Sequence, residues 1–381
     1  MRIAVEKSLR SRSNTSIFYF KTANSRRKEI AVKFDPNAAA AKDSGIFGVP
    51  CTEKKAALVL LPVPWDATTS YHSGTARGPS AILAASHFVD LFHLGVVDPY
   101  KAGIYMLPVS KRVLLVGNAE AKALATKVID AAGNVAGNPI LEESLARVNE
   151  LGKELNEFVF TESRRVLTQR KILGVMGGDH SVPLGAIRAM GKSCSQFGIL
   201  HIDAHSDTRN AFEGFTFSHA SIMRNVLNMV PQVTRLVQVG IRDLCEEEVA
   251  FCSSQGERVH TFYDRSIRAQ QFEGRQFGDI VCEIIALLPP KVWISFDVDG
   301  MDPRFCPHTG TPVPGGFDFN EICFLLKTLV ENERIIIGFD LNEVAPSKDE
   351  ADDWDANVGA RLLYELCAWT IASQGKCKVR R

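Results

Sequence analysis

The most informative absences in this sequence concern membranes, secretion and nucleic acid. The 381 residues contain no uninterrupted run of about 18 apolar residues, the length needed to cross a bilayer, so we expect no membrane span. The apolar core of a secretory signal is also missing from the start of the chain. Lys and Arg together number 44, as do Asp and Glu, and this balance gives no support to a nucleic-acid or membrane-surface partner.

The nine cysteines are scattered, and no two of them form a Cys-x-x-Cys pair. An odd number of isolated cysteines is typical of reduced thiols rather than of a disulfide scaffold. Cys306 lies near one of the acidic motifs described below, but we interpret it as a small buried hydrophobic residue. We therefore expect a cytoplasmic protein.

The start of the chain is the one region of unusual composition. Among the first 35 residues, nine are basic and three are acidic. We interpret residues 1–45 as a basic, partly flexible arm; the alternative is a mitochondrial transit segment, against which Glu6 counts. Residues 376–381 form a short basic tail, and 46–375 is expected to be the main domain.

Short, almost wholly apolar segments recur along this domain and predict strands that are buried on both faces. They are Ala57–Leu61, Ile172–Met176, Phe197–Ile202, Leu236–Val239, Val259–Phe262, Val292–Phe296 and Ile335–Phe339. Segments with helical periodicity, such as Gly78–Phe92 and Asn320–Leu329, alternate with them. This alternation indicates an α/β fold with a parallel sheet, whose ligands bind outside the carboxyl ends of the strands.

The stretch from about residue 107 to 170 has a different pattern. Ala119–Ala132 and Leu141–Arg170 are rich in Ala, Leu, Glu and Lys, and Gly133–Pro139 separates them. We interpret this stretch as a helical insertion within the main domain.

Three motifs carry His and Asp at the ends of predicted strands: Gly177–Ser181, Asp203–Asp207 and Asp297–Pro303. Side chains two apart on a strand share a face, so each motif presents its acids and imidazoles to one side. Two imidazoles and four carboxylates would then meet at one sheet edge, where they can hold two divalent cations. The residues are His180, Asp203, His205, Asp207, Asp297 and Asp299.

A donor set of carboxylates and imidazoles without thiolate suits Mn²⁺, with Ni²⁺ or Co²⁺ also compatible. The four negative charges of the carboxylates balance the charge of two divalent cations. A hydroxide ion can therefore bind to the metal pair without a large excess of negative charge. Two ions about 3.5–4 Å apart can share a water molecule and lower its pKa towards neutrality. Such a hydroxide attacks an electron-poor carbon directly.

The motifs GGDHS, DAHSD and SFDVDGMDP together resemble the arginase/agmatinase superfamily of ureohydrolases, which use paired manganese ions to hydrolyse guanidinium groups. The resemblance implies a three-layer sandwich around an eight-stranded parallel sheet. It assigns His180, Asp203, Asp207 and Asp297 to one ion, and His205, Asp203, Asp297 and Asp299 to the other. It also implies a homo-oligomer, a trimer or a hexamer.

Two further residues match catalytic positions of this family. His219 stands where the family has a histidine that carries a proton to the leaving amine, a role that suits imidazole near neutral pH. Glu343 matches the glutamate that binds the substrate, because a carboxylate can accept two parallel hydrogen bonds from a guanidinium.

Other polar residues of the motifs are expected to support the site rather than to bind metal. Asp179 and Asp302 are expected to fix a neighbouring imidazole or loop through hydrogen bonds, and His201 to be a buried supporting histidine. The family loop Gly310–Gly316 is expected to form part of the pocket wall.

The substrate indicated is agmatine, which would be hydrolysed to putrescine and urea. The loop that includes Pro62–Asp66 and Ser70–Pro79 is similar to the agmatinase branch, and Thr216 replaces the Asn with which arginases hold the substrate α-carboxylate. Arg209 would favour a guanidino acid if its charge faces the pocket, or it pairs with a neighbouring acid, which we favour.

Alternatives stay open at this point. A guanidine hydrolase or a guanidino-acid hydrolase of the guanidinobutyrase type fits the same motifs, and formimidoylglutamase and arginase fit them less well. A catalytically silent homologue that acts as a subunit or regulator is the non-enzymatic alternative, but such homologues usually lose metal ligands, and all six are present here.

Overall fold

The computed structural model describes residues 34–41, 44–349 and 351–380. From Asp35 to Arg381 the chain forms one compact unit. The basic arm predicted at 1–45 lies mostly outside the described residues. The limits of the arm, of the catalytic domain at 46–375, of the insertion at 107–170 and of the tail at 376–381 stay predictions.

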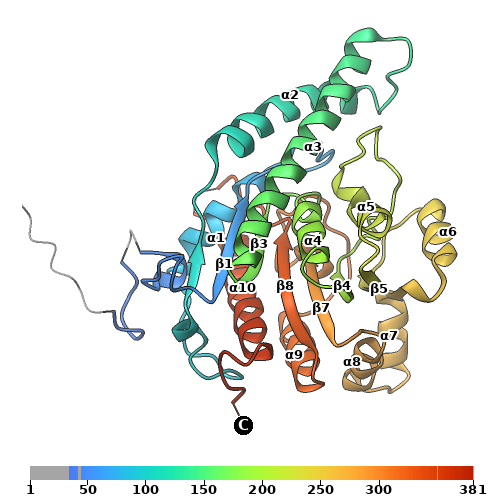
Figure 1. Cartoon of the computed structure of the whole chain (residues 1–381). Helices are drawn as coiled ribbons and strands as arrows, with labels where there is room; N and C mark the ends of the chain where they lie inside the picture. The colour runs from blue at the N-terminus through green and yellow to red at the C-terminus, as the bar shows by residue number, and fades with distance from the viewer. Residues whose placement is uncertain (1–33, 42–43, 350, 381) are drawn as a thin grey trace, which may run out of the picture. The chain divides into compact units, whose positions relative to one another are not determined.

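An eight-stranded, wholly parallel sheet forms the centre of the fold, as the family resemblance implied (Figure 1). Its order is β2-β1-β3-β8-β7-β4-β5-β6. The strands are β1 Leu58–Val63, β2 Ile104–Met106, β3 Ile172–Gly177, β4 Phe197–Ile202, β5 Val233–Ile241, β6 Val259–Tyr263, β7 Lys291–Asp297 and β8 Ile335–Asn342.

Each of the seven apolar segments forms a strand, and most strands extend beyond the segment that predicted them. β5 is the clearest case, because it begins at Val233, three residues before the predicted start. The eighth strand, β2, was not among the predicted segments, since Ile104–Met106 is too short to show a pattern. It forms because it pairs with β1 at the edge of the sheet.

Helices cover both faces of the sheet and complete a three-layer sandwich. On one face α3 packs against α4, and α4 packs against α5; on the other, α10 packs against α1, α9 and β8. The helices are α1 Gly78–Ser86, α2 Gly117–Asp130, α3 Pro139–Thr168, α4 Leu184–Gly191, α5 Ile222–Met229, α6 Glu246–Ser254, α7 Asp264–Phe272, α8 Phe277–Ala286, α9 Phe319–Glu331 and α10 Trp354–Ser373.

The region predicted to be helical between 107 and 170 contains α2 and α3, which pack along one another (Figure 1). Asn138 caps α3 by accepting hydrogen bonds from the backbone of Ile140 and Leu141, and Pro139 occupies the first turn, where it needs no partner. The helix predicted at Gly78–Phe92 is shorter, because α1 ends at Ser86.

The four central strands, β3, β8, β7 and β4, are direct neighbours although they are far apart in the sequence. Their carboxyl ends therefore lie at one edge of the sheet, where each is followed by a predicted site residue. In the described part of the chain, no helix combines the length and apolar character that a membrane crossing requires.

Candidate metal centre and active site

The carboxyl ends of neighbouring strands bring the six predicted ligands together. His180 lies just past β3, Asp203 follows β4 directly, and Asp297 is the last residue of β7. Contacts between ring nitrogens and carboxylate oxygens, of 2.9 to 3.6 Å, connect the whole set: His180, Asp203, His205, Asp207, Asp297 and Asp299. Three separate stretches of sequence thus form one buried cluster.

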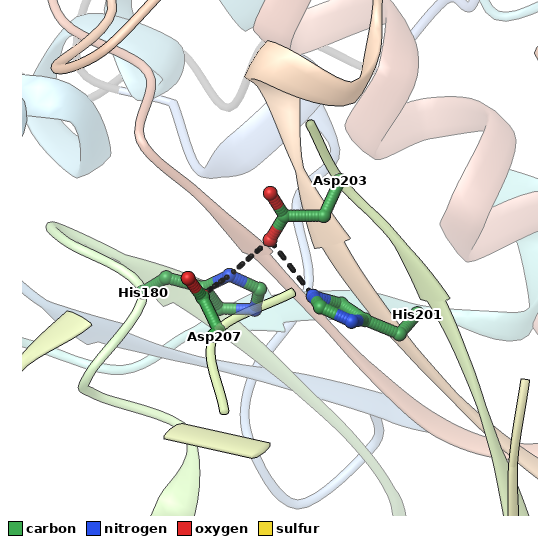
Figure 2. A group of neighbouring side chains, drawn as sticks. All are labelled: His180, His201, Asp203 and Asp207. Carbon is green, nitrogen blue, oxygen red and sulfur yellow. Dashed lines mark hydrogen bonds and ion pairs between the residues drawn. The ribbon is translucent and has the colours of Figure 1, made fainter. Parts of the chain in front are cut away.

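The first half of the cluster surrounds Nδ1 of His180 (Figure 2). This nitrogen lies 2.9 Å from Asp203 Oδ2, 3.2 Å from Asp207 Oδ2 and 3.4 Å from Asp297 Oδ2. Asp203 Oδ2 also lies 2.7 Å from Nε2 of His201. Ligand atoms of His180, His201, Asp203 and Asp207 lie within 4.8 Å of one another, close enough to surround a metal ion.

The second half consists of Asp203, His205 and Asp299, whose ligand atoms are equally close together. His205 Nδ1 lies 3.0 Å from Asp299 Oδ2 and 3.6 Å from Asp203 Oδ1. Asp203 therefore belongs to both halves, with one oxygen towards each histidine. This shared carboxylate is the arrangement that two adjacent cations require.

Backbone N–H groups fix the orientation of the carboxylates. The N–H of Asp299 donates to Asp297 Oδ1 at 2.8 Å, and the N–H of Ala204 donates to Asp299 Oδ1 at 3.0 Å. The short helical turn Val298–Gly300 creates the first of these bonds. In each carboxylate the other oxygen, Oδ2, is left to face a histidine.

A chain of hydrogen bonds behind His180 determines which of its nitrogens carries hydrogen. Nε2 lies 2.9 Å from Ser295 Oγ, whose hydroxyl donates at 2.8 Å to Asp340 Oδ1. Asp340 also accepts bonds from Trp293 and Asn342. Since the serine hydroxyl donates to Asp340, its oxygen accepts from Nε2–H, and Nδ1 is the nitrogen that faces the carboxylates.

The electrostatics of the cluster favour a cation. Burial, together with the charge of Asp203, raises the pKa of Asp207 to about 6. Burial and the charges of Asp299 and Asp203 raise the pKa of Asp297 well above its ordinary value. Bonds to the surrounding carboxylates raise the pKa of His180 well above its ordinary value, although burial opposes this shift. Buried carboxylates that repel one another, together with an imidazole nitrogen that faces them, form a donor set that fits divalent metal.

Beside this cluster lies a cavity of ≈ 10 Å³, which is about the space of one water molecule. His219 and Glu343 line it, together with Thr69–His72, Gly310 and Thr311. The two predicted catalytic residues therefore face the same small space, and the loop after β1 covers it.

Glu343 directly follows β8 and is buried. Its Oε1 accepts a 2.9 Å hydrogen bond from the backbone N–H of His180, whereas Oε2 has no partner among the described residues. The backbone of Glu343 is left-handed, with φ 66°, and bonds to Gly178 and Thr309 hold it there. A side chain on Gly310 would begin 3.0 Å from Oε2, so glycine keeps the space in front of this oxygen open.

His219 begins a short helical turn, His219–Ser221, that Ser218 caps. Its Nδ1 is buried and has no hydrogen-bond partner in the described part of the chain. Burial, with the nearby charges of His205 and His180, lowers the pKa of His219 to about 4. The imidazole is therefore neutral at physiological pH.

Comparison with known proteins identifies the family to which this chain belongs. The profile of the arginase family matches residues 56–368, which is most of the chain. The chain belongs to the arginase family. Figure 2 shows the part of the His/Asp cluster that the ends of β3 and β4 contribute.

Two of the most similar curated arginase-family relatives are enzymes from prokaryotes. N(1)-aminopropylagmatine ureohydrolase of Synechocystis is 30% identical over 333 residues, covering 84% of this chain and 91% of the relative. Agmatinase of Pyrococcus horikoshii is 30% identical over 313 residues, covering 82% and 91%. The solved agmatine ureohydrolase of Thermoplasma volcanium shares the fold, with a TM-score of 0.65 and 22% identity over 88% of this chain and 97% of that one.

The residues expected to support this arginase-family site do so through local hydrogen bonds. Asp179 Oδ1 accepts from the backbone and hydroxyl of Ser181, which fixes the loop around His180. Asp302 Oδ1 accepts from the backbone N–H of Arg304 in its own turn. His201 is fully buried between Asp203 and Gln238, although its Nε2 comes close enough to count among the possible ligand atoms.

Arg209 lies beside an acidic residue and an aromatic ring. Its Nε lies 3.7 Å from Glu248 Oε2, and its guanidinium lies over the ring of Phe212. The interpretation that Arg209 pairs with a neighbouring acid is confirmed. The backbone N–H of Thr216 donates to Asn149, so this position belongs to the contact between its loop and α3.

Sequence reasoning missed three residues that matter to the site: Ser295, Asp340 and Gln238. Ser295 pairs in register with His201 on one side and Asp340 on the other, and His201 pairs with Gln238. They form a polar row across four strands, directly behind the ligands. The available signal was a polar residue inside the apolar part of each strand, two positions before Asp203, Asp297 and Asn342 or at the matching place in β5.

Proposed function

We propose that this protein is a metal-dependent ureohydrolase that cleaves a guanidino C–N bond and releases urea and an amine. One observation carries the proposal: two His/Asp groups that share Asp203 adjoin a cavity lined by Glu343 and His219. A metal site alone would fit many hydrolases, but a buried carboxylate aimed into the adjoining cavity suits a planar cation. Membership of the arginase family supports the same chemistry.

The residues present fit two divalent cations. His180, Asp203, Asp207 and Asp297 would hold one, and His205, Asp203, Asp297 and Asp299 the other. Imidazole and carboxylate donors without thiolate favour Mn²⁺, and Ni²⁺ or Co²⁺ are compatible with the same set. When bound, such a pair activates water as a nucleophile at neutral pH.

Glu343 would bind and orient the guanidinium. Oε2 is free to accept hydrogen bonds, and Oε1 keeps a lone pair besides the one that accepts from His180. Burial and the charges of Asp297 and Asp179 raise the pKa of Glu343 well above its usual value. A bound guanidinium opposes this effect, because a cation beside the carboxylate stabilises its charged form.

His219 would carry a proton to the leaving amine. A neutral imidazole can accept a proton at one nitrogen and donate one from the other, so it transfers a proton without keeping a charge. Its place on the cavity wall, beside Glu343, supports this role.

Agmatine is the substrate that we propose first, with putrescine and urea as products. The names of the curated relatives, agmatinase and N(1)-aminopropylagmatine ureohydrolase, support a substrate with a basic tail. The pairing of Arg209 with Glu248 also offsets part of the charge that would favour a guanidino acid.

Free guanidine is a second candidate, because a specific observation favours it. The space beside Glu343 is only ≈ 10 Å³, and Thr69–His72 close it on one side. A compact guanidinium without a tail makes the smallest demand on such a space. Guanidine would give urea and ammonia instead of urea and putrescine.

The test is urea release by the Mn²⁺-loaded protein from agmatine, 4-guanidinobutyrate, arginine and guanidine at equal concentration. The proposal expects the highest kcat/KM with agmatine, and a preference for guanidine would select the second candidate. Urea from none of the four substrates would reject the proposed function.

A further inference from the structure

The loop that covers the cavity, 65–74, connects β1 to the helical turn Thr75–Arg77. Its residues Thr69–His72 line the cavity opposite Gly310 and Glu343. The backbone N–H of His72 donates to the carbonyl of Gly310 at 3.2 Å, so the loop touches the far wall. The covering loop therefore forms part of the wall of the cavity that contains Glu343.

Asp66 ties the two ends of the covering loop together. It is buried, its Oδ2 accepts from the backbone N–H of Gly74 at 3.1 Å, and its carbonyl accepts from the hydroxyl of Thr69 at 3.0 Å. One aspartate therefore closes the loop at its base.

Two side chains of α2 hold this aspartate. Lys122 Nζ donates to Asp66 Oδ2 at 2.6 Å, and Asn118 Nδ2 donates to Oδ1 at 3.1 Å. The side-chain oxygen of Asn118 also accepts from the backbone N–H of Asp66 at 2.8 Å. Residues four apart on a helix share a face, so both side chains reach the same carboxylate.

The carboxylate of Asp66 is charged despite its burial. Burial opposes the charged form, but the hydrogen bonds from Lys122 and Asn118 outweigh it and hold the pKa of Asp66 below its ordinary value. The side chain of Lys122 is 35% exposed, whereas that of Asp66 is 3% exposed. Loss of Lys122 would leave a buried carboxylate without its cation, so we expect this contact to help hold the covering loop.

The backbone before Asp66 is tightly packed. The carbonyl of Trp65 accepts from the backbone N–H of Asp179 at 2.7 Å, and a side chain on Gly178 would begin 1.9 Å from that carbonyl oxygen. The chain before Asp66 is thus packed against the loop that carries His180. The more exposed part of the loop, residues 69–73, lies between the two bonds of Asp66 to Thr69 and Gly74.

We infer that Asn118 and Lys122 are positioning residues, which hold the covering loop closed over the guanidino cavity and thereby set the size of substrate that the cavity accepts. This inference rests on the proposed function for its substrate, but the clamp itself depends only on contacts within the chain. Helix α2 is a fixed support for it, because Ala121, Ala125 and Val128 are buried on its packed face.

The experiment compares Lys122→Met with the control Lys127→Met in the full chain. Lys127 lies on the same helix but is exposed and has no hydrogen bond or ion pair in the described structure. Backbone hydrogen exchange reports the covering loop, and steady-state kinetics report its effect on substrate.

In Lys122→Met we expect exchange across 66–74 to rise by about tenfold or more, with exchange in 117–130 unchanged, because local opening is a separate equilibrium from global unfolding. We also expect KM for the preferred substrate to rise about tenfold with kcat changed little, the pattern of lost binding rather than lost chemistry. Discrimination between guanidine and agmatine should weaken. Lys127→Met should match the unmodified protein, and Lys122→Arg should restore the closed loop.

Unchanged exchange and unchanged KM in Lys122→Met would overturn the clamp, even if urea is released. If Lys122→Met does not fold, Asn118→Ala replaces it, since this change removes two bonds to Asp66 and leaves the charge of Lys122. Failure of the proposed function looks different: no guanidino substrate gives urea, while exchange in 66–74 still responds to Lys122→Met.

Discussion

His180 uses both of its ring nitrogens, and this double use is the most specific feature of the site at the scale of single residues. Nε2 is held by Ser295 and Asp340, so Nδ1 is the nitrogen turned to the carboxylates. Supporting hydrogen bonds of this kind fix the tautomer and orientation of a metal-binding histidine. The quality of the metal site therefore depends on residues that do not touch metal.

Ser295→Ala should lower the affinity for Mn²⁺ by about 10- to 100-fold, because the Nε2–H of His180 loses its acceptor and the ring is no longer oriented. The measurement is competition with a chelator. Ser254→Ala, at an exposed end of α6, is the matched control and should leave the affinity unchanged. Equal affinities in the two variants would contradict this role of Ser295.

His219→Ala should lower kcat by about 100- to 10,000-fold while KM and bound metal stay close to their original values, as expected for a lost proton carrier. His260→Ala on β6, whose ring bonds only locally to Glu257 and Arg235 in the described structure, serves as control. Steady-state urea release and metal analysis give the answer. Full activity in His219→Ala would reject proton transfer by this residue.

That the six proposed ligands lie close together could be predicted, because spacing within one strand end is a local property: Asp203, His205 and Asp207 alternate along a single stretch. The polar row of Ser295, His201, Gln238 and Asp340 could not, because its members meet only through the register of strands that are distant in sequence. The partner of Arg209 could not be predicted either, because the sequence allowed its charge to face the pocket or to pair with a neighbouring acid; in the structure it pairs with Glu248.

At the scale of elements, tight joins between strand ends and loops position the chemistry. Gly178 lies where β3 passes into the His180 loop, and the backbone of Trp65 packs directly against it. A residue with a side chain has no room at this position. The loop after β3 and the loop after β1 are thereby fixed relative to one another.

Gly178→Ala should destabilise the protein by about 1–3 kcal/mol or more, because the added carbon would overlap the carbonyl of Trp65 and force the backbone apart. Denaturant unfolding measures the change, and metal affinity should fall with it. At Gly278 the same substitution meets only the ring of Phe324 at 3.5 Å, so Gly278→Ala is the matched control. Equal stability in the two variants would show that this close packing is not tight in solution.

The strands and long helices were predictable because they are periodic or continuously apolar over many residues, as in β4 and α3. β2 was not, since three residues at a sheet edge carry no period, and the predicted helix from Gly78 ran past its end at Ser86. The contact of α2 with Asp66 could not be predicted either, because its side-chain hydrogen bonds join residues that are far apart in the sequence. Asn118 lies 52 residues after Asp66, and Lys122 lies 56 residues after it.

At the scale of the whole molecule, the fold concentrates charge that its interior would not otherwise tolerate. Six titratable side chains, five of them buried, meet at the carboxyl ends of β3, β4 and β7, next to a histidine kept neutral by burial. This concentration makes the stability of the protein depend on metal and on pH.

His219 determines the direction in which the stability of the folded protein changes with pH. Its pKa is about 4 in the folded protein, whereas a histidine in an unfolded chain titrates near 6.5. Between these values the unfolded chain binds a proton that folded His219 does not, so the stability that the neutral ring contributes is present above about pH 6.5 and is lost as pH falls towards 4. The loss from this group is about 3 kcal/mol at most.

Unfolding of the metal-free protein by denaturant, at a series of pH values, checks this effect. His219→Gln does not titrate, so its stability should fall less steeply than that of the unmodified protein over this range. Parallel curves for the two proteins would mean that His219 is not buried as a neutral ring.

The most direct test of the proposed metal-dependent ureohydrolase activity is to titrate Mn²⁺ into the metal-free protein and to follow urea release from agmatine and guanidine. We expect no urea without metal, activity that rises with added Mn²⁺, and saturation at two ions per chain. Urea release that is complete without metal, or no urea from either substrate when both sites are filled, would contradict it.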